Sequence, residues 1–555
     1  MRCYITLVGS VILYCSSCSS YASSTETSSA SLSDTTHSQT ELIRSKVGNI
    51  IVVSQPIFDL SDPESFFIHR WANALHINTQ EDTILNNMPF DVGDEVNQRE
   101  IEEAQRLLRA EAYIRDAKVT MTTVDDPDSD ATQANGSKQV IIETWDNWSL
   151  LPTASFGSSG GETKFSFGIK EDNLLGLGIR TRVKYQSSAD RTGYKFEVTA
   201  PFQWIKHAKV SASFLDNSDG TATHLAFYKP FYALNTQYMY GAKALDDTRT
   251  DTLRQNGVDI NQFEHKTEYA NVQFGWLAQR NEYDLHRISV GATFDRNTFD
   301  NLSYLPDSPL PQNREFAYPW IGYEYIEDEF SVLNNIYLIS NNEDFNLGWY
   351  HKLRLGLELN DTKQDHQPGY HVDWFTSHGI RHDNHLLLMS LDAELTQHTA
   401  QDDRYKIALR SEYFYHINPK WTAYSKIRLA SSKHNYLDDT FALGDDTGIR
   451  GYPNDYQYGD NQWAFTAELR NYPNINLYQL ANLGWALFSD VGQATGGTDD
   501  NNEINDVIGS VGVGARIYSS KSSYGNVAHI DLAVPFTQGN EINDWEFRFQ
   551  VKNHF

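Results

Sequence analysis

From Trp148 to the C-terminus, one strand-like run after another alternates between apolar and polar side chains. The final stretch shows the pattern most simply, with Trp545, Phe547 and Phe549 separated by charged residues. A period of two is typical of β-strands, because successive side chains of a strand point to opposite faces. A soluble sandwich of this length would need an unusually large core, whereas a membrane barrel turns its apolar face to lipid and its polar face to a wet lumen. We therefore predict an all-β transmembrane barrel over residues 148–555.

The composition agrees with a barrel. Aromatic residues make up 13% of the chain, while the mean hydropathy is only −0.53. An alternating barrel has such a low average because half of its strand residues face water. The net charge of −28 argues against a nucleic-acid partner, since the phosphates would be repelled.

The first residues are typical of a secretory signal. A basic start at Met1–Arg2 precedes an apolar core from Tyr4 to Tyr14, and Ser20-Tyr21-Ala22 fits a small-x-small cleavage site. We predict a signal peptide over residues 1–22 and a Ser/Thr-rich disordered leader over residues 23–46. All three cysteines lie inside the predicted signal peptide, so the mature chain would contain no disulfide.

The last residue of the chain also favours an outer-membrane barrel. Bacterial outer-membrane barrels end on a phenylalanine that is recognised during assembly, and this chain ends on Phe555. We therefore predict Phe555 to be the C-terminal assembly signal.

Residues 47–147 show a different pattern, in which strand-like and helix-like runs follow one another. An apolar run at Asn49–Ser54 precedes a helix-like stretch at Phe66–Leu75. Asn97 and Glu100 fit a capping box that opens a second helix. Two further strand-like runs follow, so the predicted order is strand, helix, helix, strand, strand.

That order, together with the segments Phe90–Asp94, Arg106–Arg109 and Tyr113–Ala117, resembles a POTRA domain. The resemblance implies a periplasmic module that receives client polypeptides by strand addition at a sheet edge. A small α+β domain without a client role fits the pattern equally well.

A long glycine-containing segment interrupts the alternation near the C-terminal end of the chain. Residues 436–461 include Gly444-Asp-Asp-Thr-Gly-Ile-Arg-Gly-Tyr452, and glycines permit tight turns that regular strands do not make. We predict a long loop between two barrel strands, with an Arg-Gly-Tyr triplet at Arg450, Gly451 and Tyr452.

This loop resembles the lumenal loop of the BamA–TamA–TpsB superfamily of outer-membrane insertases and secretion pores. Glu171–Gly178 is similar to an early hairpin of that superfamily, and Phe488–Gly492 to the strand motif that meets the loop arginine. The resemblance covers most of the chain and implies a barrel of 16 strands with the loop inside its lumen. Hairpins counted from the sequence alone give 16 to about 20 strands, because residues 330–385 do not divide clearly.

The alternation also selects partners for the loop arginine. Phe488, Asp490 and Gly492 fall on the lumenal face of one predicted strand, and Glu468 falls on the lumenal face of the strand before it. A guanidinium in a restricted lumen needs a carboxylate, because an unpaired charge is costly there. We therefore predict that Arg450 pairs with Asp490 or Glu468.

The two residues that follow Arg450 in the sequence are also expected to keep the loop in place. Gly451 is expected to let the chain turn, and Tyr452 is expected to pack against the lumen wall. The predicted pair at Arg450 would keep the loop inside the pore.

The first strand is expected to form a weak seam with the last. The stretch Leu150–Gly157 contains Pro152, which cannot donate a hydrogen bond to a ladder. The family resemblance implies that this seam is a lateral gate for client strands. A proline near the start of a strand is also ordinary.

Other motifs do not support an enzyme, a cofactor or a metal site. Gly157–Gly161 matches G-x-S-x-G, but strands on both sides make it a hairpin turn. Two adjacent aspartates, Asp445 and Asp446, are too few ligands for calcium. A histidine cluster over residues 366–385 has spacings that fit no usual zinc pattern. Its members are His366, His371, His378, His382 and His385.

The sequence and its resemblance together predict an outer-membrane protein that assembles, inserts or translocates polypeptides without a cofactor. Its expected partners are outer-membrane lipid, lipopolysaccharide and an unfolded or secreted client polypeptide. A passive porin-like or receptor-like barrel that retains the family fold is the alternative.

Overall fold

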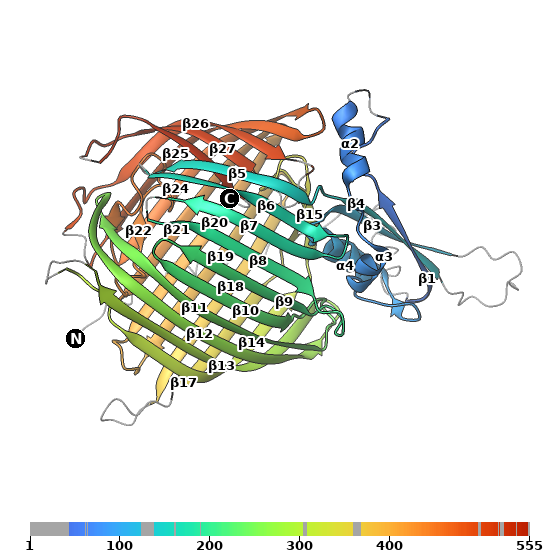
Figure 1. Ribbon diagram of the computed structural model, residues 1–555, viewed down its shortest axis with the longest axis horizontal. Coiled ribbons are helices and arrows are strands. Elements are labelled where there is room, and N and C mark those ends of the chain that lie inside the picture. The colour runs from blue at the N-terminus through green and yellow to red at the C-terminus, as the bar shows by residue number, and fades with distance from the viewer. Residues whose placement is uncertain are drawn as a thin grey trace, which may run out of the picture.

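The structure is a computed structural model. It describes residues 44–552 except residues 62, 64, 124–137, 160, 161, 189, 303–307, 359–367, 498–500, 520, 522–526 and 540. The predicted signal peptide, most of the predicted leader, His366 and Phe555 lie outside the described residues. The rest consists of a small N-terminal domain placed against one end of a large barrel-shaped sheet (Figure 1).

The N-terminal domain combines a four-stranded sheet with three helices. The sheet has the order β2-β1-β4-β3, so β3 lies at an edge. Its strands are β1 (Ser45–Gln55), β2 (Glu95–Val96), β3 (Ile114–Thr123) and β4 (Lys138–Asp146), and its helices are α2 (Phe67–Leu75), α3 (Glu81–Asn86) and α4 (Gln98–Arg109). Apolar side chains of α3, α4 and the inner strand positions form one core, because each element buries one face.

Local sequence signals located these elements well. The capping box of α4 is confirmed, since the Glu100 amide donates to Asn97 Oδ1 at 3.0 Å and the Asn97 amide donates to Glu100 Oε2 at 2.9 Å. The short elements α3 and β2 were not predicted. The leader boundary at residue 46 is wrong, because Ser45 and Lys46 already belong to β1 and pair with β2.

The remaining strands form the barrel sheet. The first half consists of β5 (Leu150–Ser159), β6 (Glu162–Leu174), β7 (Ile179–Ser187), β8 (Thr192–Pro201), β9 (Lys209–Asn217), β10 (Gly220–Lys229), β11 (Tyr238–Gln255), β12 (Val258–Arg280), β13 (Asp284–Asn301) and β14 (Arg314–Glu327). The second half consists of β17 (Tyr350–Glu358), β18 (Gly369–His382), β19 (His385–Gln397), β20 (Arg404–Asn418), β21 (Trp421–Lys433), β24 (Asn461–Leu477), β25 (Ala481–Thr495), β26 (Ile508–Ser519), β27 (Val527–Pro535) and β28 (Glu546–Lys552).

The expected number of 16 strands is wrong, because the described residues alone form 20 strands of this sheet. The number 16 came from the family resemblance, whereas the alternating pattern only identifies strands and does not limit how many a sheet holds. Residues 330–385 were hard to divide because they contain a short hairpin, β15 (Phe330–Asn334) and β16 (Asn342–Asn346), that belongs to a separate sheet.

The two faces of the barrel sheet differ as the alternation predicts. On β25 the side chains of Trp485 and Leu487 are exposed on the outer face, while Phe488 and Asp490 are buried on the inner face. The same contrast recurs along the other strands, where exposed aliphatic and aromatic residues alternate with polar ones. Among the described helices, none has the length and apolar character that a membrane span requires.

The two ends of the sheet meet where β28 lies beside β5. Among the described residues these strands share one paired position, Phe549 with Ser158. The neighbouring strands β27 and β28 form a continuous ladder from Val527–Lys552 to Ala533–Glu546. Among the described residues, the seam between β28 and β5 therefore has far less backbone pairing than the neighbouring β27–β28 ladder.

Two long connections fold against the inner face of the sheet. The inner hairpin, residues 328–349, joins β14 to β17 and carries β15 and β16. The Arg450 loop, residues 434–460, joins β21 to β24 and carries the small ladder of β22 (Ala442–Leu443) and β23 (Gln457–Tyr458).

Candidate functional site

Arg450 binds two carboxylates at once. Its Nε and Nη2 donate to the two oxygens of Asp490 at 2.6 and 2.9 Å, and its Nη1 lies 2.8 Å from Glu468 Oε1. The guanidinium also stacks over the ring of Phe488, 3.5 Å from the ring centroid. The structure thus brings together the loop arginine and three residues that the alternation placed on the inner face, on β24 and β25.

This arrangement is strong because it is forked and shielded. Arg450 is 6% exposed and Asp490 is 0% exposed, so water screens the pair poorly. Two parallel N–H···O bonds match the planar guanidinium to the carboxylate, which a lysine ammonium cannot do. Removing one partner of a buried pair typically costs about 3–5 kcal/mol, because the other charge is left uncompensated.

The residues beside Arg450 fix the path of the loop. Gly451 has φ +90°, a conformation that favours glycine, and a Cβ there would lie 3.2 Å from the Ala533 side chain. The Tyr452 hydroxyl donates to the carbonyl oxygen of Gly509 at 2.8 Å and accepts from the Gly509 amide at 3.0 Å. At Gly492 a Cβ would lie 3.1 Å from Ile449 Cδ1, so a larger residue would press on the loop.

A second ion pair ties the Arg450 loop to the last strand. Arg548 of β28 donates from Nε to Asp445 Oδ2 at 2.7 Å, and its Nη1 lies 3.4 Å from Asp531 Oδ2. Asp531 in turn pairs with Arg516 of β26 at 2.5 Å. These four residues were not among the predicted site residues. The alternation along the strands could have placed Arg516, Asp531 and Arg548 on the inner face. It does not indicate that Asp445 of the loop contacts β28.

The inner hairpin also contacts the charged side chains around Arg450. Arg470 of β24 pairs with Glu468 at 2.8 Å and donates from Nη1 to the carbonyl oxygen of Ile336 at 3.3 Å. The Tyr337 hydroxyl donates to Glu412 Oε2 on β20 at 2.7 Å. Around them, apolar side chains of the hairpin pack with inner-face residues of β19, β20 and β21. Sequence reasoning missed this contact.

Glu343 holds the turn of the inner hairpin. Its two carboxylate oxygens accept hydrogen bonds from the backbone amides of Ile336, Tyr337 and Leu338 at 3.0 to 3.2 Å. Burial raises the pKa of Glu343 to about 7, although the amides act in the opposite direction.

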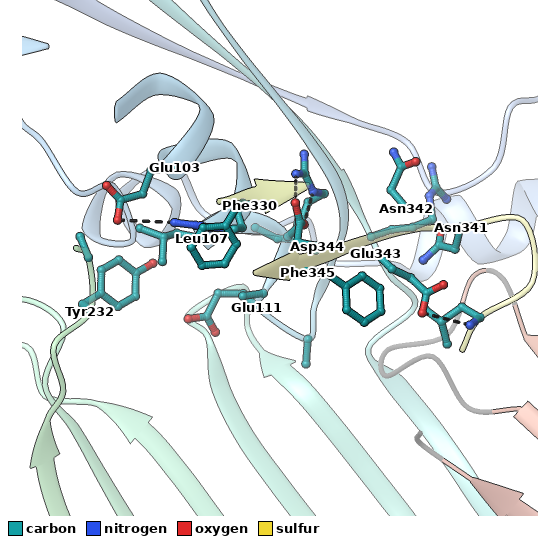
Figure 2. Close-up of a pocket in the computed structure, with 18 of the residues that line it drawn as sticks. Glu103, Leu107, Glu111, Tyr232, Phe330, Asn341, Asn342, Glu343, Asp344 and Phe345 are labelled. Carbon is teal, nitrogen blue, oxygen red and sulfur yellow. Dashed lines mark hydrogen bonds and ion pairs between the residues drawn. The ribbon is translucent and has the colours of Figure 1, made fainter. Parts of the chain in front are cut away.

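Helix α4 is attached to the inner hairpin. Arg109 donates from Nε and Nη2 to the two oxygens of Asp344 at 2.8 and 2.6 Å, and the Arg106 guanidinium lies 3.3 Å from the centroid of the Phe330 ring. A cavity of about 680 Å³ lies among α4, the hairpin and the β10–β11 turn, and residues of all three line it. Figure 2 shows the Asp344 carboxylate paired with a guanidinium, whereas Glu343 points away from it toward the turn.

The match to a protein family is decisive for this chain. Residues 173–555 match the Omp85 superfamily domain. The chain belongs to the Omp85 superfamily. It is therefore a protein of the Gram-negative outer membrane, with its N-terminal domain on the periplasmic side.

Solved structures similar to this Omp85 chain differ strongly from it in sequence. BamA from Haemophilus ducreyi lacking POTRA domains 1–3 has 13% identity over 91% of this chain and 84% of that chain, with a TM-score of 0.43. CdiB from Acinetobacter baumannii has 12% identity over 92% and 74%, and CdiB from Escherichia coli has 10% identity over 95% and 92%, both with a TM-score of 0.45. No curated protein matches the chain.

His371 and His378 of the histidine cluster make ring contacts in this Omp85 protein. His371 stacks on Tyr318 with centroids 3.9 Å apart and lies 3.0 Å from Glu358, while His378 stacks on Trp349 at 4.4 Å. Within the described part of the chain, no group of three His, Cys, Asp or Glu residues could hold a metal ion.

Proposed function

We propose that this protein inserts polypeptides into the outer membrane, or moves them across it, through a barrel whose seam opens sideways. The single observation that carries the proposal is the seam itself, where the described residues of β28 and β5 share one paired position. Each backbone hydrogen bond that is absent lowers the cost of separating two strands. Pro152, which has no amide hydrogen, adds to this weakness in β5.

The Arg450 loop would act as the latch of the seam. Arg450 holds the loop to β24 and β25, while Asp445 in the same loop holds Arg548 of β28. Movement of the loop would therefore release the last strand from the inner side. Omp85 membership and these contacts support a gate that couples the loop to the seam.

The N-terminal domain would receive the client. Its strand–helix–strand order supports a POTRA-like domain over residues 47–147, and β3 offers a sheet edge to which a client strand can add. Because Arg109 of α4 pairs with Asp344 of the inner hairpin, a movement of the N-terminal domain on client binding would be transmitted to the hairpin in the lumen. Lipid and lipopolysaccharide would surround the outer face.

A passive pore is less well supported. A porin-like barrel conducts through its lumen and needs neither a seam with little pairing nor a periplasmic domain attached to a lumenal hairpin. In this chain both features occur together.

Cross-linking the seam tests the proposal. Cysteines replacing Ser158 and Phe549 in a chain that begins after residue 22 should form a disulfide across the seam and abolish insertion of a small unfolded barrel protein into vesicles. Cysteines replacing Ser377 and Ser390, which pair within the β18–β19 ladder, are the matched control and should leave insertion unchanged. Full activity of the cross-linked seam would overturn the lateral gate. Ion conductance without any insertion by the uncross-linked protein would favour the passive pore.

Deleting residues 47–145 separates the two parts. The truncated barrel should still insert and conduct ions but should no longer process the client polypeptide. Unchanged client processing would show that the N-terminal domain is not the receiver.

A further inference from the structure

Helix α2 exposes two large aromatic side chains. Phe67 and Trp71, one helical turn apart, are 69% and 64% exposed, and Ala74 continues the exposed stripe. His69 is buried and Asn73 is half-buried on the opposite side. Ala72 is buried on the inward side as well. The exposed aromatic pair is therefore additional to the face that packs on the domain, at positions where a helix of a soluble domain usually carries polar residues.

Hydrogen bonds hold the helix in this orientation. His69 Nε2 lies 2.9 Å from the carbonyl oxygen of Tyr478. Asn73 Nδ2 donates to the Phe58 carbonyl oxygen at 2.9 Å, and Asn73 Oδ1 accepts from the Phe58 amide at 3.1 Å. These bonds fix the inward face of the helix, which leaves Phe67 and Trp71 on the outside.

The helix lies at the periplasmic rim of the barrel, next to its lipid-facing surface. Phe66 packs edge-on against Tyr478 of the β24–β25 turn, with ring centroids 5.7 Å apart. In that turn Tyr478, Leu477 and Leu480 are themselves exposed, at 63%, 43% and 39%. Figure 1 shows α2 standing crosswise to the barrel at this end, level with the barrel wall. The exposed stripe of α2 therefore continues the apolar outer band of the barrel.

We propose that α2 lies in the interface of the periplasmic leaflet, with Phe67 and Trp71 between the lipids and Arg70 at the headgroup phosphates. Aromatic side chains are enriched at the membrane–water interface, and a short amphipathic helix lies in the plane of that interface with its apolar face in the acyl boundary. Arg70 is exposed beside the two rings, and an arginine pairs well with phosphate. The occupant of this face is the lipid that already covers the adjacent barrel surface.

This contact would anchor the N-terminal domain beside the seam. Phe58, which is bonded to α2, has the Lys521 ammonium of the β26–β27 connection 5.9 Å from its ring centroid. Trp148, just before β5, packs against the same cluster beneath α2. Lipid on one side and these contacts on the other would restrict rotation of the domain.

Spin labels measure the depth of the helix directly. The full chain without residues 1–22 is reconstituted into phosphatidylethanolamine–phosphatidylglycerol vesicles with a nitroxide on Phe67→Cys, Trp71→Cys or, as control, the exposed β3 position Lys118→Cys. Oxygen, which concentrates in lipid, should relax the labels at 67 and 71 several-fold more than a water-soluble nickel chelate does, and the label at 118 should show the reverse. Equal access of the nickel chelate to all three positions would overturn the proposal.

A second measurement leaves the helix unlabelled. The fluorescence of Trp71 is obtained as the difference between the wild type and Trp71→Phe. Lipids brominated on the upper acyl chain should quench this difference. Absence of quenching in vesicles that contain only lipid and this protein would contradict a lipid contact and point to a protein partner as the cover of this face.

Discussion

Arg470 donates a hydrogen bond from Nη1 to the carbonyl oxygen of Ile336, at 3.3 Å. Arg470 also pairs with Glu468, which pairs with Arg450. The inner hairpin and the Arg450 loop, which enter from opposite ends of the barrel, are therefore connected through side chains of one strand, β24. Movement of either segment would therefore alter the ion pairs that hold the other segment in place.

Arg450→Ala should loosen the loop, raise the ion conductance and lower client insertion, while the barrel still forms. Removing one partner of a shielded ion pair costs about 3–5 kcal/mol, and water in the lumen reduces this cost. Arg450→Lys should rescue conductance only in part, because an ammonium lacks the forked geometry. Planar-bilayer recordings and heat-modifiable migration on gels provide the two measurements.

Asp490→Ala should reproduce the effect of Arg450→Ala. The double variant should be much less than additive, since the two residues act as one pair. Strictly additive changes in conductance would show that the two side chains do not work together.

Arg109→Ala should free the inner hairpin from the N-terminal domain. Arg109 makes two charge-assisted bonds to Asp344, whereas Arg99 on the same helix donates to the Glu282 carbonyl oxygen in another turn. A nitroxide on Ser340→Cys should become more mobile in Arg109→Ala and in Asp344→Ala, but not in the control Arg99→Ala. Equal mobility in all three variants would contradict a specific attachment.

The seating of the inner hairpin should depend on pH through Glu343. Its pKa of about 7 in the seated hairpin exceeds its ordinary value of 4.5 in water. The seated state therefore binds a proton that the released state does not, so seating is favoured at low pH and weakens as the pH rises from 4.5 to about 7. The charged or titratable groups that face Glu343 are an arginine and three tyrosines, side chains whose ordinary pKa values lie far above this range. They are Arg470, Tyr337, Tyr472 and Tyr518.

The mobility of the Ser340 label should accordingly increase between pH 4.5 and pH 7. Glu343→Gln, which carries no proton equilibrium, should flatten this dependence. A wild-type label whose mobility is independent of pH would show that Glu343 does not titrate in the seated hairpin.

Removing Phe555 should impair assembly more than it alters the finished barrel. The terminal residue is predicted to act as the assembly signal, so fewer molecules should reach the membrane, and those that do should conduct normally. Quantifying the protein in outer-membrane fractions checks this. An unchanged yield would contradict the signal role.

The sequence by itself determined which side chain faces which way. Alternation follows from the two-residue period of a strand, so the order of residues alone assigns Phe488 and Asp490 to the inner face. The capping box at Asn97 is equally local, because it links residues three positions apart. The in-phase carboxylates Asp490 and Glu468 were selected by the same rule, and both contact Arg450.

Tertiary structure alone decided the number of strands, the pairing at the seam and the path of the two inner segments. A period of two is the same in a sheet of any size, so it cannot distinguish 16 strands from the 20 present. Contacts such as Asp445 with Arg548 and Ile336 with Arg470 join residues far apart in the chain, and they depend on register and on the curvature of the sheet. The role of the exposed face of α2 also depends on the tertiary structure, because this face can contact lipid only where the barrel places it beside the membrane surface.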